Sequence, residues 1–288
     1  MIIDAHAHLD SHMLRVEQFI QKMDANGIDK VALIASLNDP LPETPELLLS
    51  IIRKVLQSKL TRPIAQVIHR STMTFEGDLR LHGKTYQIYH KPDNATVISA
   101  IQDYPDRFLG WIFLNPKNNP KIIDELEYWR AMPKMIGVKF HPHWHNYRTE
   151  IMSPILNRIK DLKLPVLIHL GFGKQGDFGS LIQNFPQITF IFAHAGVPFY
   201  KELWKFSRSL KNVYVDLSSP YLDESLARYT VQIMGVDKCI YGTDCPYGFP
   251  DEQHTYNYEI IKGWIERMPI KSQDIDKLLG ENFLKIIG

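Results

Sequence analysis

Short runs of aliphatic and β-branched residues alternate with longer amphipathic segments along most of the chain. The apolar runs have the length of strands and lie at residues 1–9, 30–36, 107–115, 135–142, 164–171, 188–196, 212–219 and 238–246. Between and after them, apolar residues recur with a spacing near 3.6. This spacing predicts helices at 15–27, 94–104, 121–132, 153–162, 178–185, 200–210, 223–235 and 255–268, with a terminal helical pair at 274–287.

Strands that alternate with helices are typical of βαβ units, in which the strands are parallel. Eight such units predict a closed (β/α)8 TIM barrel that forms a single α/β domain over residues 1–288. A doubly wound open sheet is the structural alternative. No internal repeat or linker divides the chain.

One segment between the second and third strands interrupts this alternation. Its first part, PELLLSIIRKVLQS, has the apolar spacing of a helix. The following part predicts a β-hairpin at about 72–90, because Leu79 and Leu81 alternate with polar residues before the turn-prone pair His82-Gly83. We therefore expect a hairpin-like insertion at about 60–92, which either covers the mouth of the barrel or forms a subunit contact.

Composition and charge narrow the classes of function. The chain has 44% hydrophobic and 23% charged residues, as an ordinary globular protein does. Lys and Arg total 33 against 32 Asp and Glu, so a net charge of +1 gives no field that would attract nucleic acid or an anionic membrane. No signal peptide or membrane span is apparent, and Cys239 and Cys245 are expected to be free thiols. We expect a cytoplasmic protein with a small-molecule substrate, and a homo-oligomer remains open.

The first strand, MIIDAHAHL, carries three polar residues at alternate positions. Asp4, His6 and His8 share one strand face, which would point into the barrel. Each unpaired polar group there would cost about 1–3 kcal/mol. A metal ion or a dense hydrogen-bond network must therefore compensate.

Other predicted strands also end in polar residues, namely His141, His169, His194 and Asp244. In a barrel these carboxyl ends meet at one mouth, where active sites of this architecture lie. Taken singly, each residue could be a hydrogen-bonded core histidine or a helix cap. Taken together, two imidazoles from strand one, one from strand five and a carboxylate from strand eight suit Zn²⁺, with Mn²⁺ or Fe²⁺ as alternatives.

The motifs D-x-H-x-H, GVKFHP, IHLG, AHAG and YGTDCP, in this order along the chain, resemble those of the amidohydrolase superfamily. They are most similar to the branch that includes aminocarboxymuconate-semialdehyde decarboxylase and 2-pyrone-4,6-dicarboxylate lactonase. The resemblance implies that His6, His8, His169 and Asp244 bind one divalent metal ion. It also implies that Asp244 moves protons and that His194 orients or polarises the substrate or the water.

These implied roles predict a metal-dependent hydrolase. A divalent ion lowers the pKa of a water ligand to about 7, and Asp244 could take the proton of that water and return it to the leaving group. His194 could stabilise charge on the attacked carbonyl oxygen of an amide, ester or lactone, in a small and carboxylated substrate. A non-oxidative decarboxylase on the same scaffold is the main alternative. A phosphoesterase or deoxyribonuclease, or a non-catalytic binding barrel, ranks lower.

Lys139 and the loop after the fourth strand have ambiguous roles. Lys139 would bridge two metals if it were carbamylated, but we favour one metal and a lysine hydrogen-bonded beneath the site, to Asp4. His141, with His143 and Arg148 of the loop HPHWHNYR, could bind a substrate carboxylate. The alternative for this loop is a solvated surface segment.

Overall fold

Eight parallel strands form one sheet whose spatial order follows the order of the chain. The computed structural model describes residues 1–288. The strands are β1 (Ile3–Leu9), β2 (Lys30–Ala35), β5 (Phe108–Phe113), β6 (Met135–Phe140), β7 (Val166–Ile168), β8 (Phe190–Phe192), β9 (Val213–Asp216) and β10 (Cys239–Ile240). Each strand pairs with the next one in this series. All eight lie within the ranges predicted from the sequence.

Hydrogen bonds between β1 and the residues that follow β10 close the sheet. Ala5 N donates to Tyr241 O at 3.1 Å, and Asp244 N donates to His6 O at 2.7 Å. Because the first and last strands are joined, the predicted (β/α)8 barrel is confirmed and a doubly wound open sheet is not formed.

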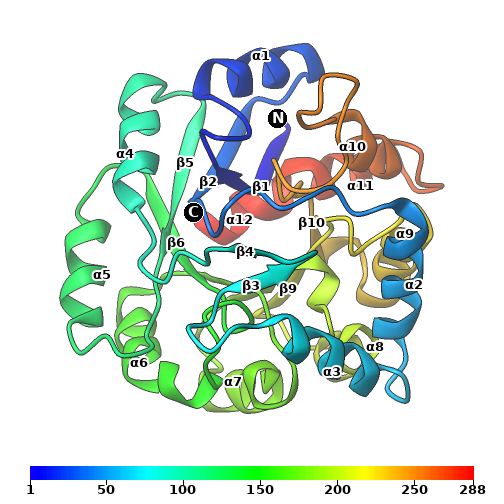
Figure 1. Cartoon of the computed structure of the whole chain (residues 1–288). Helices are drawn as coiled ribbons and strands as arrows, with labels where there is room; N and C mark the ends of the chain where they lie inside the picture. Colours follow the sequence, from blue (N-terminus) through cyan, green and yellow to red (C-terminus); the bar gives the residue numbers. More distant parts are fainter.

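Helices cover the outside of the sheet (Figure 1). They are α1 (Val16–Asn26), α4 (Asn94–Asp103), α5 (Ile122–Arg130), α6 (Ser153–Leu162), α7 (Phe178–Asn184), α8 (Tyr200–Ser207), α9 (Glu224–Met234) and α10 (Glu259–Glu266). Several begin at an aspartate whose side chain accepts a backbone N–H, as Asp93, Asp177 and Asp223 do. The chain ends with α11 (Ser272–Asp276) and α12 (Asn282–Ile287), joined by a wider helical turn over Lys277–Glu281. One cluster of 72 buried residues joins the barrel to these helices.

The insertion after β2 consists of two helices and a hairpin. These are α2 (Glu46–Gln57), α3 (Arg62–Thr72), β3 (Leu79–Leu81) and β4 (Lys84–Tyr86). The hairpin is present as predicted, since β3 and β4 pair antiparallel. The sequence prediction missed α3, although Pro63 in its first turn and the apolar spacing of Ile64, Val67 and Ile68 mark a helix.

Two buried arginines attach this insertion to the barrel. Arg53 of α2 donates to Pro220 O at 2.8 Å, and Arg62 of α3 pairs with Glu202 at 2.9 Å. The pair α2–α3 therefore lies beside the mouth of the barrel, where the polar strand ends meet.

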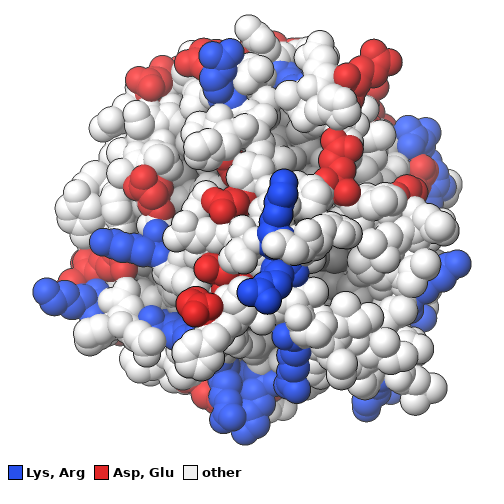
Figure 2. Space-filling model, viewed as in Figure 1, with Lys and Arg blue, Asp and Glu red and all other residues white.

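Acidic and basic side chains are interspersed on the face that carries this mouth (Figure 2). No helix has both the length and the apolar character needed to cross a membrane. Cys239 and Cys245 are buried free thiols, as expected.

Candidate metal centre

The carboxyl ends of six strands bring a set of buried polar side chains to one place. The set comprises His6 and His8 of β1, Lys139 and His141 from β6, His169 from β7, His194 from β8, Asp216 of β9 and Asp244 after β10. All of them are buried, and none is more than 8% exposed. The prediction that these strand ends meet at one mouth is therefore confirmed.

Two imidazoles of β1 are held by hydrogen bonds at Nδ1. His6 Nδ1 lies 2.8 Å from Asp216 Oδ2, and His8 Nδ1 lies 3.1 Å from Ala35 O. Both acceptors need a proton on Nδ1, so each Nε2 carries a lone pair and no proton. The Nε2 atoms of His6 and His8 lie 3.5 Å and 3.7 Å from Asp244 Oδ1, so both imidazoles are close to the same carboxylate.

A second chain of hydrogen bonds orders the imidazoles of β7 and β8. Ser218 Oγ donates to Asp216 Oδ1 at 2.5 Å and accepts from His194 Nδ1 at 2.7 Å. His194 Nε2 therefore carries a lone pair and no proton, and it lies 3.7 Å from Asp244 Oδ2. His169 Nδ1 lies 3.0 Å from His194 Nε2 and donates to it, which leaves a lone pair on His169 Nε2.

These side chains are suited to a divalent ion. One ligand atom each of His6, His194 and Asp244 lies within 4.8 Å of the other two, and His8 and His169 are adjacent. Burial lowers the pKa of all four imidazoles well below its usual value, so they are neutral, as metal ligands must be. His169 and His194 are adjacent, and the assignment of His169 as the ligand stays a prediction.

Lys139 lies inside this group. Its Nζ is 3.0 Å from His6 Nε2, and burial lowers its pKa to about 8. Burial also raises the pKa of Asp244 to about 8, although the charge of Lys139 acts in the opposite direction. The expected contact of Lys139 with Asp4 is not formed, because Asp4 lies deeper and accepts from Thr243 N at 3.0 Å.

Two of the site residues have a left-handed backbone. The φ angles of His194 and Asp244 are 54° and 64°. This conformation costs about 1–2 kcal/mol for a residue with a Cβ atom. Strained residues of this kind cluster at functional sites, where a side chain must leave the regular strand direction.

A cavity of about 600 Å³ opens above the site. Its floor contains His8, Lys139, His141, His169 and Asp244, and its walls come from the segments 37–52, 219–221 and 246–255. Nine of the 27 lining residues are hydrophobic. Lys139 is the only Lys or Arg among them, so the wall itself supplies no cationic group.

The structure separates the three residues predicted to bind the substrate. His141 lines the cavity, and its Nδ1 accepts from Trp144 N at 3.2 Å. His143 does not line the cavity and instead stacks on His69 with ring centroids 4.1 Å apart. Arg148 is exposed outside the cavity, because the preceding Tyr147 turns inward and is buried.

Sequence reasoning missed Asp216 and Ser218, in the segment VDLSS of β9 and its end. Asp216 is fully buried and connects His6 with His194 through the bonds described above. Its position as a carboxylate at a strand end is the signal that also identified Asp244. A carboxylate at the end of a predicted strand therefore marks a site residue at Asp216 as it does at Asp244.

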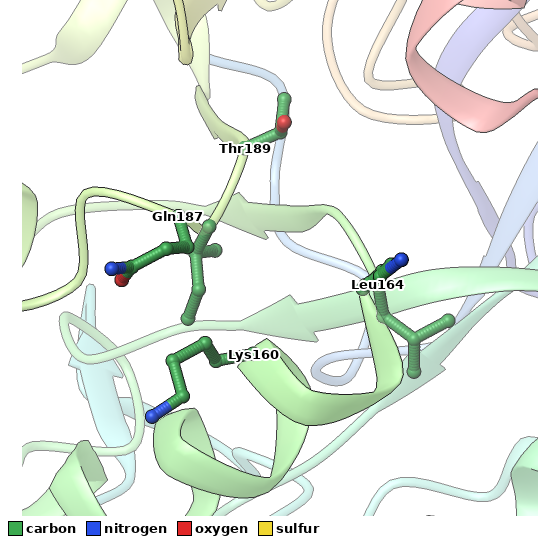
Figure 3. Close-up of a pocket in the computed structure, with 6 residues that line it drawn as sticks. Lys160, Leu164, Gln187 and Thr189 are labelled. Atoms are coloured by element: carbon green, nitrogen blue, oxygen red, sulfur yellow. The ribbon is translucent and has the colours of Figure 1, made fainter.

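A second cavity, of about 530 Å³, lies at the opposite ends of β7 and β8 (Figure 3). It is lined by Lys160, Lys163, Leu164, Gln187, Ile188 and Thr189. These residues include no imidazole, thiol or carboxylate. This cavity therefore offers none of the ligands found at the barrel mouth.

Comparison with known proteins identifies the family. The family model described as amidohydrolase matches residues 3–288. The chain belongs to the amidohydrolase family. The resemblance seen in the sequence motifs is thereby confirmed, and the chain is an enzyme of this family. No curated protein matches the sequence.

Several solved structures share the fold of this amidohydrolase. A 4-oxalomesaconate hydratase from Rhodopseudomonas palustris is 16% identical, with a TM-score of 0.63 over 100% of this chain and 95% of that one. A probable 2-pyrone-4,6-dicarboxylic acid hydrolase from Acinetobacter baumannii is 17% identical (TM-score 0.62, 100% and 99% covered). A 5-carboxyvanillate decarboxylase from Novosphingobium aromaticivorans, complexed with manganese, is 17% identical (TM-score 0.59, 94% and 79% covered). At these identities the likeness establishes the fold alone.

Proposed function

We propose that this amidohydrolase is a metal-dependent hydrolase that cleaves an amide, ester or lactone of a small molecule bound in the 600 Å³ cavity. One observation carries the proposal. His6, His8 and His194 each have Nδ1 hydrogen-bonded, and their Nε2 atoms, which carry no proton, all lie within 3.7 Å of an oxygen of Asp244. Neutral imidazoles beside one carboxylate form the nitrogen and oxygen set that zinc prefers.

The residues that would hold one divalent ion are His6, His8 and Asp244, with His169 or His194. We propose zinc, and manganese is the alternative that the manganese-containing neighbour supports. When bound, such an ion activates water and polarises a carbonyl group. The remaining steps depend on the side chains of this chain.

Asp244 is the proposed proton carrier. Without a metal ion, burial raises the pKa of this carboxyl group to about 8, and a bound cation would lower that pKa and keep the group a carboxylate. Such a carboxylate could accept a proton from water and return it to the leaving group. Its place beside the cavity floor brings it to the substrate.

His141 is better placed than His194 to stabilise charge on the substrate oxygen. The Trp144 N–H donates to His141 Nδ1, so the imidazole proton of His141 is on Nε2 and can be donated. His194 instead gives its proton to Ser218 and accepts from His169. We therefore assign the oxyanion contact to His141 and the ordering of the site to His194.

The cavity favours a small substrate with one anionic group. Lys139 is the only Lys or Arg that lines it, and Glu43 and Glu46 lie in the wall. A single carboxylate or enolate could lie near Lys139, whereas a second carboxylate would have no cationic partner. The apolar wall, with Leu49 and Phe249, would hold the body of the molecule.

A decarboxylase is the second candidate. Lys139 and the metal ligands are close enough together for a substrate carboxylate to lie between them, and one fold neighbour is a decarboxylase. The phosphoesterase or nuclease alternative is disfavoured, because a cavity with one lysine is not a basic groove. The complete ligand set disfavours a non-catalytic barrel.

The test is a substrate panel with the zinc-loaded and the manganese-loaded protein. Release of acid from lactones, esters or amides supports the hydrolase, and release of CO₂ from aromatic acids supports the decarboxylase. Asp244→Asn should lower kcat by about 10²-fold or more, because proton transfer contributes about 10²–10⁴-fold to such reactions. Metal-loaded protein that turns over none of these classes would contradict the proposal.

A further inference from the structure

The insertion after β2 exposes an unusual number of large apolar side chains. Eight of the 15 exposed large hydrophobic residues of the chain lie between residues 47 and 75. They are Leu47, Leu48 and Ile51 of α2, Leu60 of the connecting turn, Ile64, Val67 and Ile68 of α3, and Phe75, and their exposed fractions run from 48% to 101%. We name these eight residues the α2–α3 apolar face.

The eight side chains of the α2–α3 apolar face together expose a large apolar area. With on the order of 200 Å² for a large apolar side chain, these fractions amount to roughly 1,000 Å². The largest apolar patch of a typical monomer is about 300–600 Å². Figure 2 shows, at its lower right, a broad area over α2 and α3 with few charged side chains.

We propose that the α2–α3 apolar face binds the same face of a second copy of this chain. A standard interface buries about 800 Å² on each partner, which the exposed area of this face supplies. A two-fold axis lets one patch meet itself, so no second surface is required. This inference does not depend on the reaction that the site catalyses.

A two-fold axis near Ile51 makes the two α2 helices antiparallel, with the exposed Leu47, Leu48 and Ile51 of each copy in the contact. Glu46 stays outside this contact, because it pairs with the buried Arg53 of its own helix and lines the cavity. The centre of the contact is therefore apolar.

The contact would also support the catalytic cavity. The opposite side of α2 lines the cavity with Leu49 and Ile52, so α2 lies between the cavity and the second copy. Arg53 hydrogen-bonds to Pro220 and Leu222 of the barrel, and Leu56 of the same helix is buried in the core. A dimer would therefore hold one wall of the cavity in place.

Sedimentation velocity on the full chain tests the proposal. The wild-type protein at about 50 µM should sediment with about twice the monomer mass of 33.4 kDa. Ile51→Glu should weaken self-association at least about tenfold, because it places a charge at the centre of the interface. The matched control Ile123→Glu changes an exposed apolar residue of α5 and should leave the dimer intact. Thermal unfolding of both variants checks that they are folded.

A cysteine placed on the axis gives a second readout. Ile51→Cys should form a disulfide-linked dimer under mild oxidation, because the two copies of residue 51 meet, and Ile123→Cys should not. The natural cysteines are buried and do not compete. A wild-type monomer at about 50 µM would overturn the proposal. A dimer that Ile51→Glu leaves unchanged would also overturn it. A monomer that binds vesicles of phosphatidylcholine and phosphatidylserine would overturn it too, and would assign the face to a membrane surface.

Discussion

Asp216→Asn should weaken metal binding without changing the shape of the site. The Asp216 carboxylate accepts from His6 Nδ1 and His194 N at 2.8 Å, and from Ser218 Oγ at 2.5 Å. Asparagine keeps one accepting oxygen and replaces the other by an NH₂ donor. If this donor faces His6 Nδ1, the imidazole proton moves to Nε2, the atom whose lone pair the metal needs.

The size of this effect follows from the burial of the group. Asp216 is 0% exposed, so water cannot replace the lost acceptor. Changes to residues that orient metal-binding histidines lower metal affinity by about 10–100-fold. This range corresponds to about 1.4–2.8 kcal/mol of binding free energy. We expect Asp216→Asn to fall within it for both Zn²⁺ and Mn²⁺.

Competition with a chromogenic chelator measures these affinities. Asp4→Asn is the matched control, because Asp4 is also a fully buried carboxylate of the barrel but contacts no imidazole ring. The control should bind metal within about threefold of the wild type. Wild-type affinity in Asp216→Asn, or an equal loss in both variants, would refute the role assigned to Asp216.

Three further results are expected. Burial raises the pKa of Asp4 to about 7, so between about pH 4 and 7 the folded chain keeps a proton that the unfolded chain releases. The stability that this group contributes is therefore lost as the pH rises through that range. Relative to Asp4→Asn, the unfolding free energy of the metal-free wild type should fall by about 1.4 kcal/mol per pH unit, and parallel pH profiles of the two proteins would contradict this. Gly137→Ala should cost about 1–3 kcal/mol in urea unfolding, because the new Cβ would lie 2.5 Å from the Trp111 ring and 2.7 Å from Pro165 O, and unchanged stability would count against the packing described. Lys139→Met should retain one metal equivalent in elemental analysis, because a single ion needs no bridging lysine; two equivalents in the wild type would show that Lys139 bridges two ions.

The barrel could be predicted from the sequence because each strand is a short apolar run between amphipathic helices. The strand ends were placed less well, as β7 shows. Residues 164–171 were predicted to form this strand, whereas the strand spans Val166–Ile168. Helix α3 was missed because its apolar residues face solvent and pack against no strand, so they do not follow the βα alternation.

Polar residues at strand ends identified most of the site. His6, His8, His169 and Asp244 lie together as the sequence predicted, since parallel strands bring their carboxyl ends to one mouth. Asp216 was missed although, like Asp244, it is a carboxylate at a strand end. Its partner His6 is 210 positions away, and only the folded barrel brings the two together.

The finer chemistry of the site depends on hydrogen bonds that no sequence pattern encodes. The proton positions of His141 and His194 follow from Trp144 N and Ser218 Oγ. They are the reason why we propose His141 for the oxyanion contact, a role that the family resemblance implied for His194. Arg148 likewise has a side chain suited to a carboxylate, but the turn at Tyr147 directs it to solvent.

Elemental analysis of the purified protein after reconstitution with zinc tests the central claim most directly. We predict one metal equivalent per chain in the wild type and almost none in His6→Ala, with both proteins folded. Wild-type protein that holds no metal after reconstitution would contradict the account of the site and of its chemistry.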